Sequence, residues 1–332
     1  MHYKNLSLHN IEDVREVMWP PGIFKLQRMP EDVRLKLNEG AQGRGLATAN
    51  SEIRFVCEGP FTIHLRSPNG ENQFHIAYGS FLGRSYPISD CAIEVEAPEI
   101  MSKLHRDRLS EQPFDSRVVR VLLPNAEVEF VRLEAEGLRP PRPEEVPKKR
   151  LLCCGTSITQ GGCATTPHLS YASLTARHLG CDLINLGLGG SFYAEQELAD
   201  YVAGRQDWNV ATIGISVNMV PCFEEEEFRK RVNYFINTVA AAHPEKPVIC
   251  MTLFPYFNDL CGVPPENSRK AENFRVILRE AFQNSSCGNL HLVEGADILD
   301  DVYGLTPDLI HPSDFGMFRM ASNLADRLRP LL

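Results

Sequence analysis

Short apolar runs alternate with helix-like segments through the second half of the chain. Five of these runs have the length and composition of buried strands: 151–154, 181–186, 210–215, 248–253 and 290–293. Between the first two, residues 171–179 are expected to form a helix that stops at Gly180. Strands that alternate with helices build a parallel sheet covered on both faces. We therefore expect an α/β fold for this half of the chain.

A further helix is predicted between the third and fourth strands. Its apolar residues recur at the spacing of one helix face: Phe228, Val232, Phe235, Ile236 and Val239. Glutamates fill positions 224–227 ahead of this pattern, where negative charge is favourable against the helix dipole. They could also form a metal-binding acidic cluster. We favour the first interpretation, a capped and solvated start of the helix.

The first half of the chain has a strand-like pattern instead. Polar and apolar residues alternate in short runs that Gly, Pro, Asn and Asp interrupt: 51–58, 61–66, 92–97, 118–123 and 127–134. Gly59 and Pro60 separate the first two runs. Residues 31–38 are an ambiguous candidate for a helix in this region. The pattern predicts an antiparallel β-sandwich.

The chain changes character at residues 139–150, which are rich in proline and charge. Proline fixes φ and removes a hydrogen-bond donor, so an extended linker is expected here. A basic recognition patch is the alternative, although two glutamates interrupt it. These patterns divide the chain into a β-sandwich domain over 1–138, a proline-rich linker over 139–149 and an α/β domain over 150–332.

The composition argues against several classes of partner. The chain has 332 residues, a formal net charge of −9 and a pI near 5.6, which makes it a poor candidate for binding nucleic acid or an anionic membrane. The first residues lack the apolar core of a signal peptide, and no run approaches the ~18 apolar residues of a membrane span. We expect a cytoplasmic protein and leave open whether it forms a homo-oligomer.

The ten cysteines raise the question of disulfides or a metal site. No C-x-x-C pair occurs, and Cys153 and Cys154 are adjacent in a predicted strand, where neighbouring side chains point to opposite faces. Reduced and mostly buried thiols are therefore expected. We predict neither a metal ion nor a cofactor.

Polar residues suited to catalysis follow the ends of the predicted strands. Ser157 comes directly after the first strand, and Asp308 and His311 come after the fifth. In a parallel sheet these ends meet at one rim. Acyl transfer through a covalent ester requires three groups: a hydroxyl, an imidazole that takes its proton and a carboxylate that orients the imidazole. Taken alone, Asp308 and His311 could simply belong to a turn before a helix.

Two more strand ends could supply hydrogen-bond donors to a tetrahedral oxyanion. Residues 185–191 form a glycine-rich loop whose backbone can approach closely, with Gly190 near its end, and Asn218 offers a side-chain amide. The loop could instead bind a dinucleotide, but the G-x-G-x-x-G pattern needs glycine where Phe192 stands, and the loop follows the second strand. Asn218 could be an ordinary turn asparagine.

Four blocks in order along the chain resemble those of the SGNH hydrolases, also called GDSL-like lipases and acylhydrolases. They are Gly155-Thr156-Ser157, Asn185 to Gly190, Asn218 and Asp308 to Pro312. The resemblance covers residues 150–330 and implies a three-layer, flavodoxin-like catalytic domain with a parallel sheet. The whole chain is similar to a two-domain branch with a preceding, jelly-roll-like β-sandwich, which includes carbohydrate esterases and acyl-transferring tailoring enzymes.

The resemblance also implies a role for each matching residue. Ser157 would be the nucleophile, His311 the base and Asp308 the partner of the base. Ser157 N–H, Gly190 N–H and the Asn218 side chain would form the oxyanion hole.

Two positions depart from the pattern of the family. Thr156 stands where the first block usually has aspartate, and Met219 replaces the aspartate after the asparagine. Both lie beside site residues, so they bear on the substrate class more than on the activity.

The expected function is a serine esterase for short acyl esters, acetyl above all, on a carbohydrate. Its partner would be a small-molecule or oligosaccharide ester. Acyl transfer to a hydroxyl acceptor by the same residues and glycan binding without catalysis are the alternatives. Residues 161–168 and 254–259 are expected to border the cleft, where Tyr256 and Phe257 either line it or pack the loop.

Overall fold

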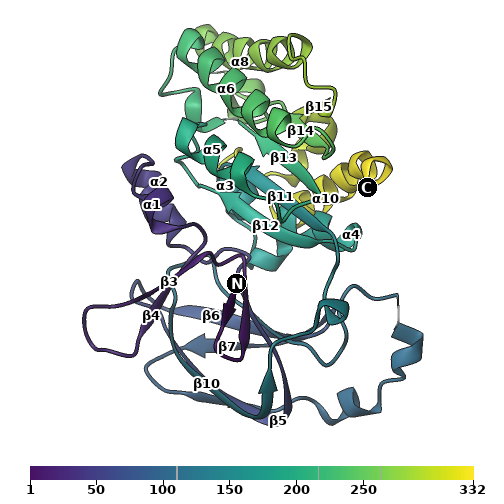
Figure 1. Cartoon of the computed structure of the whole chain (residues 1–332). Helices are drawn as coiled ribbons and strands as arrows, with labels where there is room; N and C mark the ends of the chain where they lie inside the picture. Colours follow the sequence, from purple (N-terminus) through teal and green to yellow (C-terminus); the bar gives the residue numbers. More distant parts are fainter. Residues whose placement is uncertain (110, 216, 263) are drawn as a thin grey trace. The chain divides into compact units, whose positions relative to one another are not determined.

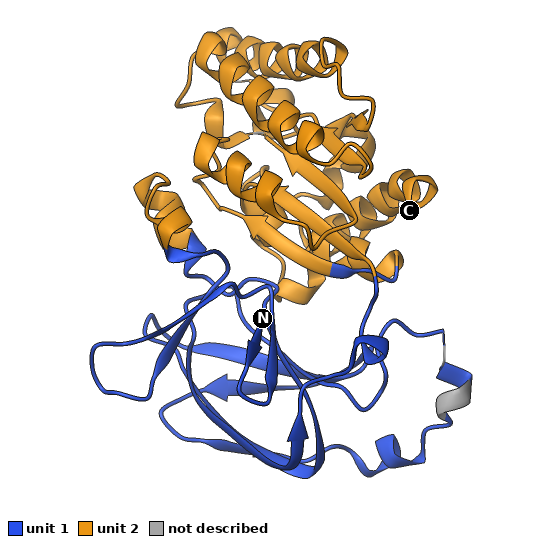
Figure 2. Cartoon of the chain, in the orientation of Figure 1, with its two compact units in different colours: residues 1–31, 45–148, 180–182 blue, residues 32–44, 149–179, 183–332 orange. Residues whose placement is uncertain are grey.

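The chain forms two compact units in the computed structural model (Figure 2). The structure describes residues 1–109, 111–215, 217–262 and 264–332. The first unit comprises residues 1–31, 45–148 and 180–182, and the second comprises residues 32–44, 149–179 and 183–332. Two short segments thus group away from their neighbours in the chain: 32–44 and 180–182.

The first unit is built from antiparallel strands, in the order β3-β4-β10-β5-β9-β6-β7 with β1, β2 and β8 beside them. All five predicted runs contain strands. The bounds are β1 (His2–Tyr3), β2 (Leu6–His9), β3 (Asp13–Glu16), β4 (Phe24–Gln27), β5 (Glu52–Arg66), β6 (Asn72–Tyr78), β7 (Phe81–Ile88), β8 (Ile93–Val95), β9 (Val119–Leu122) and β10 (Glu129–Arg139), with 3₁₀ turns η1 (Glu99–Lys103), η2 (Arg106–Leu109) and η3 (Pro143–Glu145).

β5 differs from the prediction, which placed a break at Gly59 and Pro60. The strand runs without interruption from Glu52 to Arg66. Gly59 has a φ of +69°, a conformation that glycine adopts readily. Residues 52–55 of the strand pair with β2 and β9, residues 61–63 pair with β8, and β10 pairs with residues between 56 and 66. One long strand therefore serves both sheets of the sandwich.

A buried charge network lies inside the first unit. The Arg54 guanidinium donates two hydrogen bonds to Asp182, 2.6 and 2.7 Å long, and a third of 2.7 Å to Glu52. Arg120 also binds the Glu52 carboxylate. Burial raises the pKa of Glu52, but the guanidiniums of Arg120 and Arg54 outweigh it and hold that pKa well below its ordinary value. These bonds account for the grouping of residues 180–182 with the first unit.

The proline-rich stretch differs from the extended linker expected over 139–149. Arg139 ends β10, and Pro143–Glu145 form the 3₁₀ turn η3. The buried Glu145 carboxylate accepts hydrogen bonds from the Arg139 guanidinium and from the Arg142 backbone N–H. Because these bonds fix its backbone, the stretch up to residue 148 folds as part of the first unit.

The sheet of the second unit has five strands in the order β12-β11-β13-β14-β15. β11, β13, β14 and β15 pair in parallel register. Numbered along the chain, this order is 2-1-3-4-5, which is the flavodoxin-like arrangement. Each predicted strand is confirmed, with the bounds β11 (Arg150–Gly155), β12 (Asp182–Gly187), β13 (Val210–Gly214), β14 (Val248–Met251) and β15 (Leu290–Val293).

Helices cover both faces of this sheet (Figure 1). α4 packs against α10, while α5, α6 and α8 form a layer on the other face. No helix among the described residues combines the length and hydropathy needed to cross a bilayer. The bounds are α1 (Glu31–Arg34), α2 (Glu39–Gly45), α3 (Ser157–Gln160), η4 (Pro167–Leu169), α4 (Tyr171–His178), α5 (Gln196–Gly204), η5 (Val217–Met219), α6 (Glu225–Ala242), α7 (Phe257–Leu260), α8 (Pro265–Gln283), α9 (Gly295–Ile298), η6 (Val302–Gly304), α10 (Asp314–Leu328) and η7 (Arg329–Leu331).

The helix face predicted between the third and fourth strands is confirmed on α6. Its five apolar residues are all completely buried. Phe228 stacks on Phe274 of α8, with ring centroids 3.8 Å apart. Glu224 is the N-cap, and Glu225, Glu226 and Glu227 occupy the first turn, as expected for a capped helix start.

Removal of the Phe228 ring tests this packing. Phe228→Ala should lower the free energy of unfolding by about 3–5 kcal/mol, because it deletes a fully buried ring and leaves a cavity. Val276 on α8 is 40% exposed, and Val276→Ala serves as the control. The control should change the same free energy by less than about 0.5 kcal/mol. Urea denaturation followed by circular dichroism measures both, and equal losses would contradict the assignment.

Candidate active site

Ser157 lies just beyond β11, where the strand turns into the short helix α3. Thr156 is the N-cap of this helix, and Gly161 ends it with a φ of +101°. A Cβ at Gly162 would come within 3.1 Å of the His311 ring and 3.3 Å of the Ser157 Cβ. Glycine at these two positions therefore lets the chain turn back beside the Ser157 hydroxyl without a clash.

The structure brings Ser157, His311 and Asp308 into mutual contact. Ser157 Oγ lies 2.7 Å from His311 Nε2, although the two residues are 154 positions apart. His311 Nδ1 lies 2.7 Å from Asp308 Oδ2. Both distances are those of hydrogen bonds. If Nδ1 carries the proton toward the carboxylate, Nε2 is free to accept the proton of the hydroxyl.

The turn that carries Asp308 and His311 is held by its own carboxylate. Asp308 Oδ1 accepts hydrogen bonds of 2.9 Å from the N–H groups of Ile310 and His311, and one of 2.8 Å from Thr306 Oγ1. Burial raises the pKa of Asp308, but these bonds and the one from the His311 ring outweigh it and hold that pKa well below its ordinary value. The carboxylate therefore stays charged and faces the imidazole in a fixed orientation.

Gly190 and Asn218 follow the two strands that flank β11 in the sheet. Gly190 has a φ of +71°, and the position of a Cβ there has no atom within 4 Å. A Cβ at Gly189 would come within 3.3 Å of the Ser157 Cβ, so the loop 188–191 abuts the Ser157 turn. Asn218 lies on η5, and its Oδ1 is buried without a hydrogen-bond partner in the part of the chain that the structure describes.

Two buried amides hold the glycine loop against the Ser157 turn. Asn185 donates a hydrogen bond of 2.7 Å to the Thr159 carbonyl and accepts one of 2.8 Å from the Gly187 N–H. Gln160 accepts one of 2.6 Å from the Gly189 N–H. Sequence reasoning found Asn185 as the start of a block but missed Gln160. Nothing next to Gln160 in the chain indicates its role, because its partner lies 29 residues away.

Cys163 adds a thiol beside this site. The thiol is exposed, and the ligating atoms of Cys163, Asp308 and His311 all lie within 4.8 Å of one another. Such a set of ligands could hold a metal ion, so the absence of a metal requirement stays a prediction. By contrast, Cys153 and Cys154 on β11 are buried as expected, and burial raises the pKa of the Cys153 thiol to about 12.

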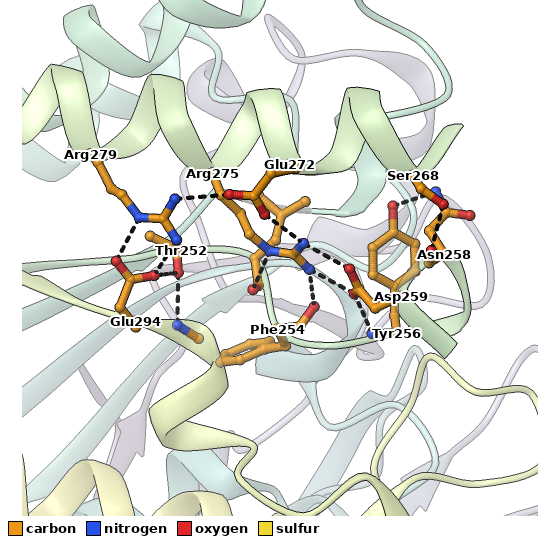
Figure 3. A network of polar contacts seen from close by, with 12 residues as sticks. Thr252, Phe254, Tyr256, Asn258, Asp259, Ser268, Glu272, Arg275, Arg279 and Glu294 are labelled. Atoms are coloured by element: carbon orange, nitrogen blue, oxygen red, sulfur yellow. Dashed lines mark hydrogen bonds and ion pairs between the residues drawn. The ribbon is translucent and has the colours of Figure 1, made fainter. Parts of the chain in front are cut away.

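A polar network holds residues 254–259, which were expected to border the cleft (Figure 3). Both terminal nitrogens of Arg275 donate to the Asp259 carboxylate, at 2.8 and 2.7 Å. The Tyr256 ring is buried, and the backbone N–H of Phe257 donates to the Leu309 carbonyl at 2.8 Å. Tyr256 therefore packs this segment, and the segment braces the turn between Asp308 and His311.

Residues 161–168 are tied to the start of α10. The backbone N–H and the hydroxyl of Thr165 donate to the two carboxylate oxygens of Asp314, at 2.9 and 2.7 Å. Asp314 follows shortly after His311 in the chain. This pair of bonds therefore links the segment after Ser157 to the segment after His311.

Comparisons with known proteins show the family and the fold of the chain. The model of the GDSL-like Lipase/Acylhydrolase family matches residues 148–329. A search among curated proteins returned no match.

Several solved structures share the fold. A salicylyl-acyltransferase, SsfX3, from a tetracycline biosynthetic pathway is similar with a TM-score of 0.80 at 16% identity, over 99% of this chain and 96% of that chain. A candidate GDSL-like lipase from Bacteroides ovatus ATCC 8483 has a TM-score of 0.70 at 16% identity, over 99% and 96%. A family two carbohydrate esterase from Clostridium thermocellum, in complex with cellohexaose, has a TM-score of 0.61 at 16% identity, over 86% and 93%.

Loss of the Asn185 amide tests how the glycine loop is held. Asn185→Ala should lower the free energy of unfolding by about 2–4 kcal/mol, because it leaves the Gly187 N–H and the Thr159 carbonyl without their buried partner. The control is Asn233→Ala on α6, where the amide donates to the Arg229 carbonyl at the exposed surface of a helix. This control should change stability by less than about 0.5 kcal/mol. Urea titrations of the two variants check the difference, and a wild-type midpoint for Asn185→Ala would refute it.

Proposed function

Because the chain belongs to the GDSL-like lipase/acylhydrolase family, we propose that this ester hydrolase removes short acyl groups, acetyl above all, from a carbohydrate. The observation that carries the proposal is the continuous hydrogen-bonded chain from Ser157 Oγ through the His311 ring to Asp308. A hydroxyl in contact with a neutral imidazole, itself oriented by a carboxylate, is the arrangement that activates serine as a nucleophile.

Acylation would begin when His311 Nε2 takes the proton of the Ser157 hydroxyl while Oγ attacks the carbonyl carbon of the ester. The carbonyl π bond becomes an oxyanion in the tetrahedral intermediate. The imidazolium then gives its proton to the leaving alkoxide as the C–O bond breaks, which releases the alcohol and leaves an acyl-serine. Asp308 stabilises the imidazolium between these two transfers because it stays ionised.

Deacylation would repeat the cycle with water. His311 takes a proton from a water molecule as its oxygen attacks the acyl carbon. The imidazolium then returns a proton to Ser157 Oγ, and the carboxylic acid leaves. The serine, the histidine and the aspartate are thereby restored to their starting state, with no change of oxidation state in either half-reaction.

Three donors would stabilise the oxyanion in both half-reactions. Ser157 is the first residue of α3, so its N–H has no acceptor within its own helix. Gly190 N–H belongs to the loop that abuts Ser157, and the Asn218 amide lies after the neighbouring strand. The Asn218 side chain carries an NH₂ group that can donate two hydrogen bonds. Donors fixed in place before the reaction are the main source of catalysis in such sites.

The substrate class rests on two lines of support. The esterase from Clostridium thermocellum that shares the fold is described as a carbohydrate esterase and was solved with cellohexaose. Residues 161–168, which follow Ser157, are mostly small and carry no large apolar side chain, so they offer little apolar surface for a long acyl chain. The hydrogen-bonded trio speaks against the alternative of a glycan-binding protein without catalysis.

A second candidate function is acyl transfer to a hydroxyl other than water. The observation that favours it is the similarity to the salicylyl-acyltransferase, which extends over 99% of this chain with a TM-score of 0.80. The same residues would serve, with an acceptor alcohol in place of water in the second half-reaction. Mass spectrometry of products formed with an added alcohol or sugar acceptor separates the two functions. Transfer products in excess of free acid would favour the transferase.

Hydrolysis of p-nitrophenyl esters tests the proposed esterase. The value of kcat/KM should be about tenfold or more higher for the acetate than for the octanoate, because a site for short acyl groups excludes the extra methylenes. Ser157→Ala should lower turnover about 10⁴-fold or more and leave the thermal unfolding transition in place.

Ser285→Ala is the matched control for this experiment, since the Ser285 hydroxyl binds Asn237 and is remote in sequence from Ser157. The control should retain wild-type turnover. A preference for octanoate would remove the short-acyl proposal. Wild-type turnover in Ser157→Ala would remove the serine mechanism.

The pH profile tests the separate roles of His311 and Asp308. Acidification should lower log kcat/KM with a slope of about one, because one proton on His311 removes the base. Asp308 should not add a second step, since its lowered pKa keeps it ionised until the pH falls through that lowered value. Rates in buffers of constant ionic strength, with thermal unfolding followed over the same range, give the profile. A slope of about two, or a rate that rises on acidification, would contradict these roles.

A further inference from the structure

Residues 32–44 form a helical segment, most of α1 and α2, that groups with the second unit (orange in Figure 2). The chain enters this segment from β4 and leaves it toward β5, two strands of the first unit. Its hydrogen bonds to the rest of the second unit go to Gly189, Ser191 and Glu195, which follow β12. Gly189 and Ser191 belong to the loop 188–191. This loop carries Gly190, a proposed donor to the oxyanion.

Arg44 makes the most informative of these contacts. Its guanidinium Nε donates a hydrogen bond of 3.0 Å to the Gly189 carbonyl, across 145 positions of the chain. The Gly189 carbonyl and the Gly190 N–H belong to one planar peptide group. A cationic donor on the oxygen end of that group therefore fixes the direction in which its N–H end points.

Asn38 holds a second peptide group of the same loop, two residues further along the chain. Its side-chain nitrogen donates to the Ser191 carbonyl at 3.0 Å, and its backbone N–H donates to Glu195 Oε1 at 2.6 Å. Gly40 packs so closely on this loop that a Cβ there would lie 2.2 Å from Ser191 Oγ and 3.1 Å from Ser191 Cβ. The helical segment therefore contacts the loop at several points, and these contacts hold the backbone that carries Arg44.

We propose that Arg44 is a positioning residue for the oxyanion hole. This rests on the proposed function of Gly190 as a donor. Arg44 touches neither substrate nor Ser157 in this role. It orients the Gly189–Gly190 peptide group and draws electron density toward the carbonyl oxygen, which makes the Gly190 N–H a stronger donor.

The expected effect is moderate because Arg44 is exposed to solvent, which screens its charge. Loss of a complete oxyanion donor costs about 10²–10³ in kcat. Loss of a group that positions one donor among three should cost less, about five- to tenfold in kcat. Because the oxyanion exists only after attack on the ester, KM should change by less than about twofold.

The experiment compares Arg44→Met, Arg44→Lys and Arg34→Met in the full chain with p-nitrophenyl acetate as substrate. Arg34 lies in the same segment, but its Nη1 donates to the Gln42 carbonyl within that segment. Arg34→Met thus loosens the segment without removal of the contact to Gly189. Arg44→Lys keeps a cation that can donate to the same carbonyl and should recover part of the lost kcat.

Thermal unfolding and the rate of Ser157 labelling by a fluorophosphonate complete the comparison. We expect slower turnover and slower labelling in Arg44→Met, partial rescue in Arg44→Lys and near wild-type kcat in Arg34→Met. Wild-type kcat in Arg44→Met, or an equal loss in Arg34→Met, would overturn the positioning role alone. A wild-type protein that neither hydrolyses the ester nor reacts at Ser157 would overturn the proposed function, and the role of Arg44 with it.

Discussion

The strand order of the parallel sheet decides where the chemistry of this protein lies. β11 stands between β12 and β13, so the chain passes to one side of its first strand and then to the other. Such a reversal opens a crevice at the carboxyl ends of the strands. Ser157 leaves β11 at that crevice, and the loops with Gly190 and Asn218 follow the two flanking strands. β11 is almost entirely buried, so the position of Ser157 is as fixed as the core itself.

The sheet brings the turns together, but hydrogen bonds within and between the turns aim the side chains. Asp308 accepts bonds from two backbone N–H groups and a threonine hydroxyl before it meets the His311 ring. Asn185 on β12 binds Thr159 of α3, and Gln160 of α3 binds Gly189 in the loop after β12. Groups that are already held in this way need little reorganisation when charge develops, which is the physical basis of catalysis by preorganisation.

The features that sequence predicts here are those with a local signal. Buried strands appear as apolar runs, and the buried face of α6 appears as a 3.6-residue period, because each depends on neighbours a few positions away. Three of the four blocks that match the family also lie at the ends of strands, where glycine and polar residues are conspicuous, and the fourth, Asp308 to Pro312, directly precedes α10. The contact between Ser157 and His311 across 154 positions follows from the topology of the sheet and not from any local pattern.

Features that depend on remote partners left no such signal. Gly59 and Pro60 look like a strand break, yet β5 continues because β10 pairs with it on both sides of that point, at Val56 and Glu58 before it and from Phe61 after it. Arg54 and Asp182 form a buried pair across 128 positions, and neither neighbourhood reveals the other. Residues 31–38 look like an ambiguous helix in a β-domain, because the partners of Asn38 and Arg44 lie 145 to 157 positions away, after β12.

A backbone N–H cannot be tuned by a change of its own side chain. Its direction can be set through the carbonyl of the same peptide group. In both proposed backbone donors, that carbonyl accepts a hydrogen bond. For Ser157 N–H the carbonyl is that of Thr156, which accepts the first helical hydrogen bond of α3 from the Gln160 N–H at 3.0 Å. For Gly190 N–H the carbonyl is that of Gly189, which belongs to none of the helices in the described part of the chain and accepts a hydrogen bond from Arg44 instead. Arg44 of the segment 32–44 thus orients the Gly190 N–H, as the first hydrogen bond of α3 orients the Ser157 N–H.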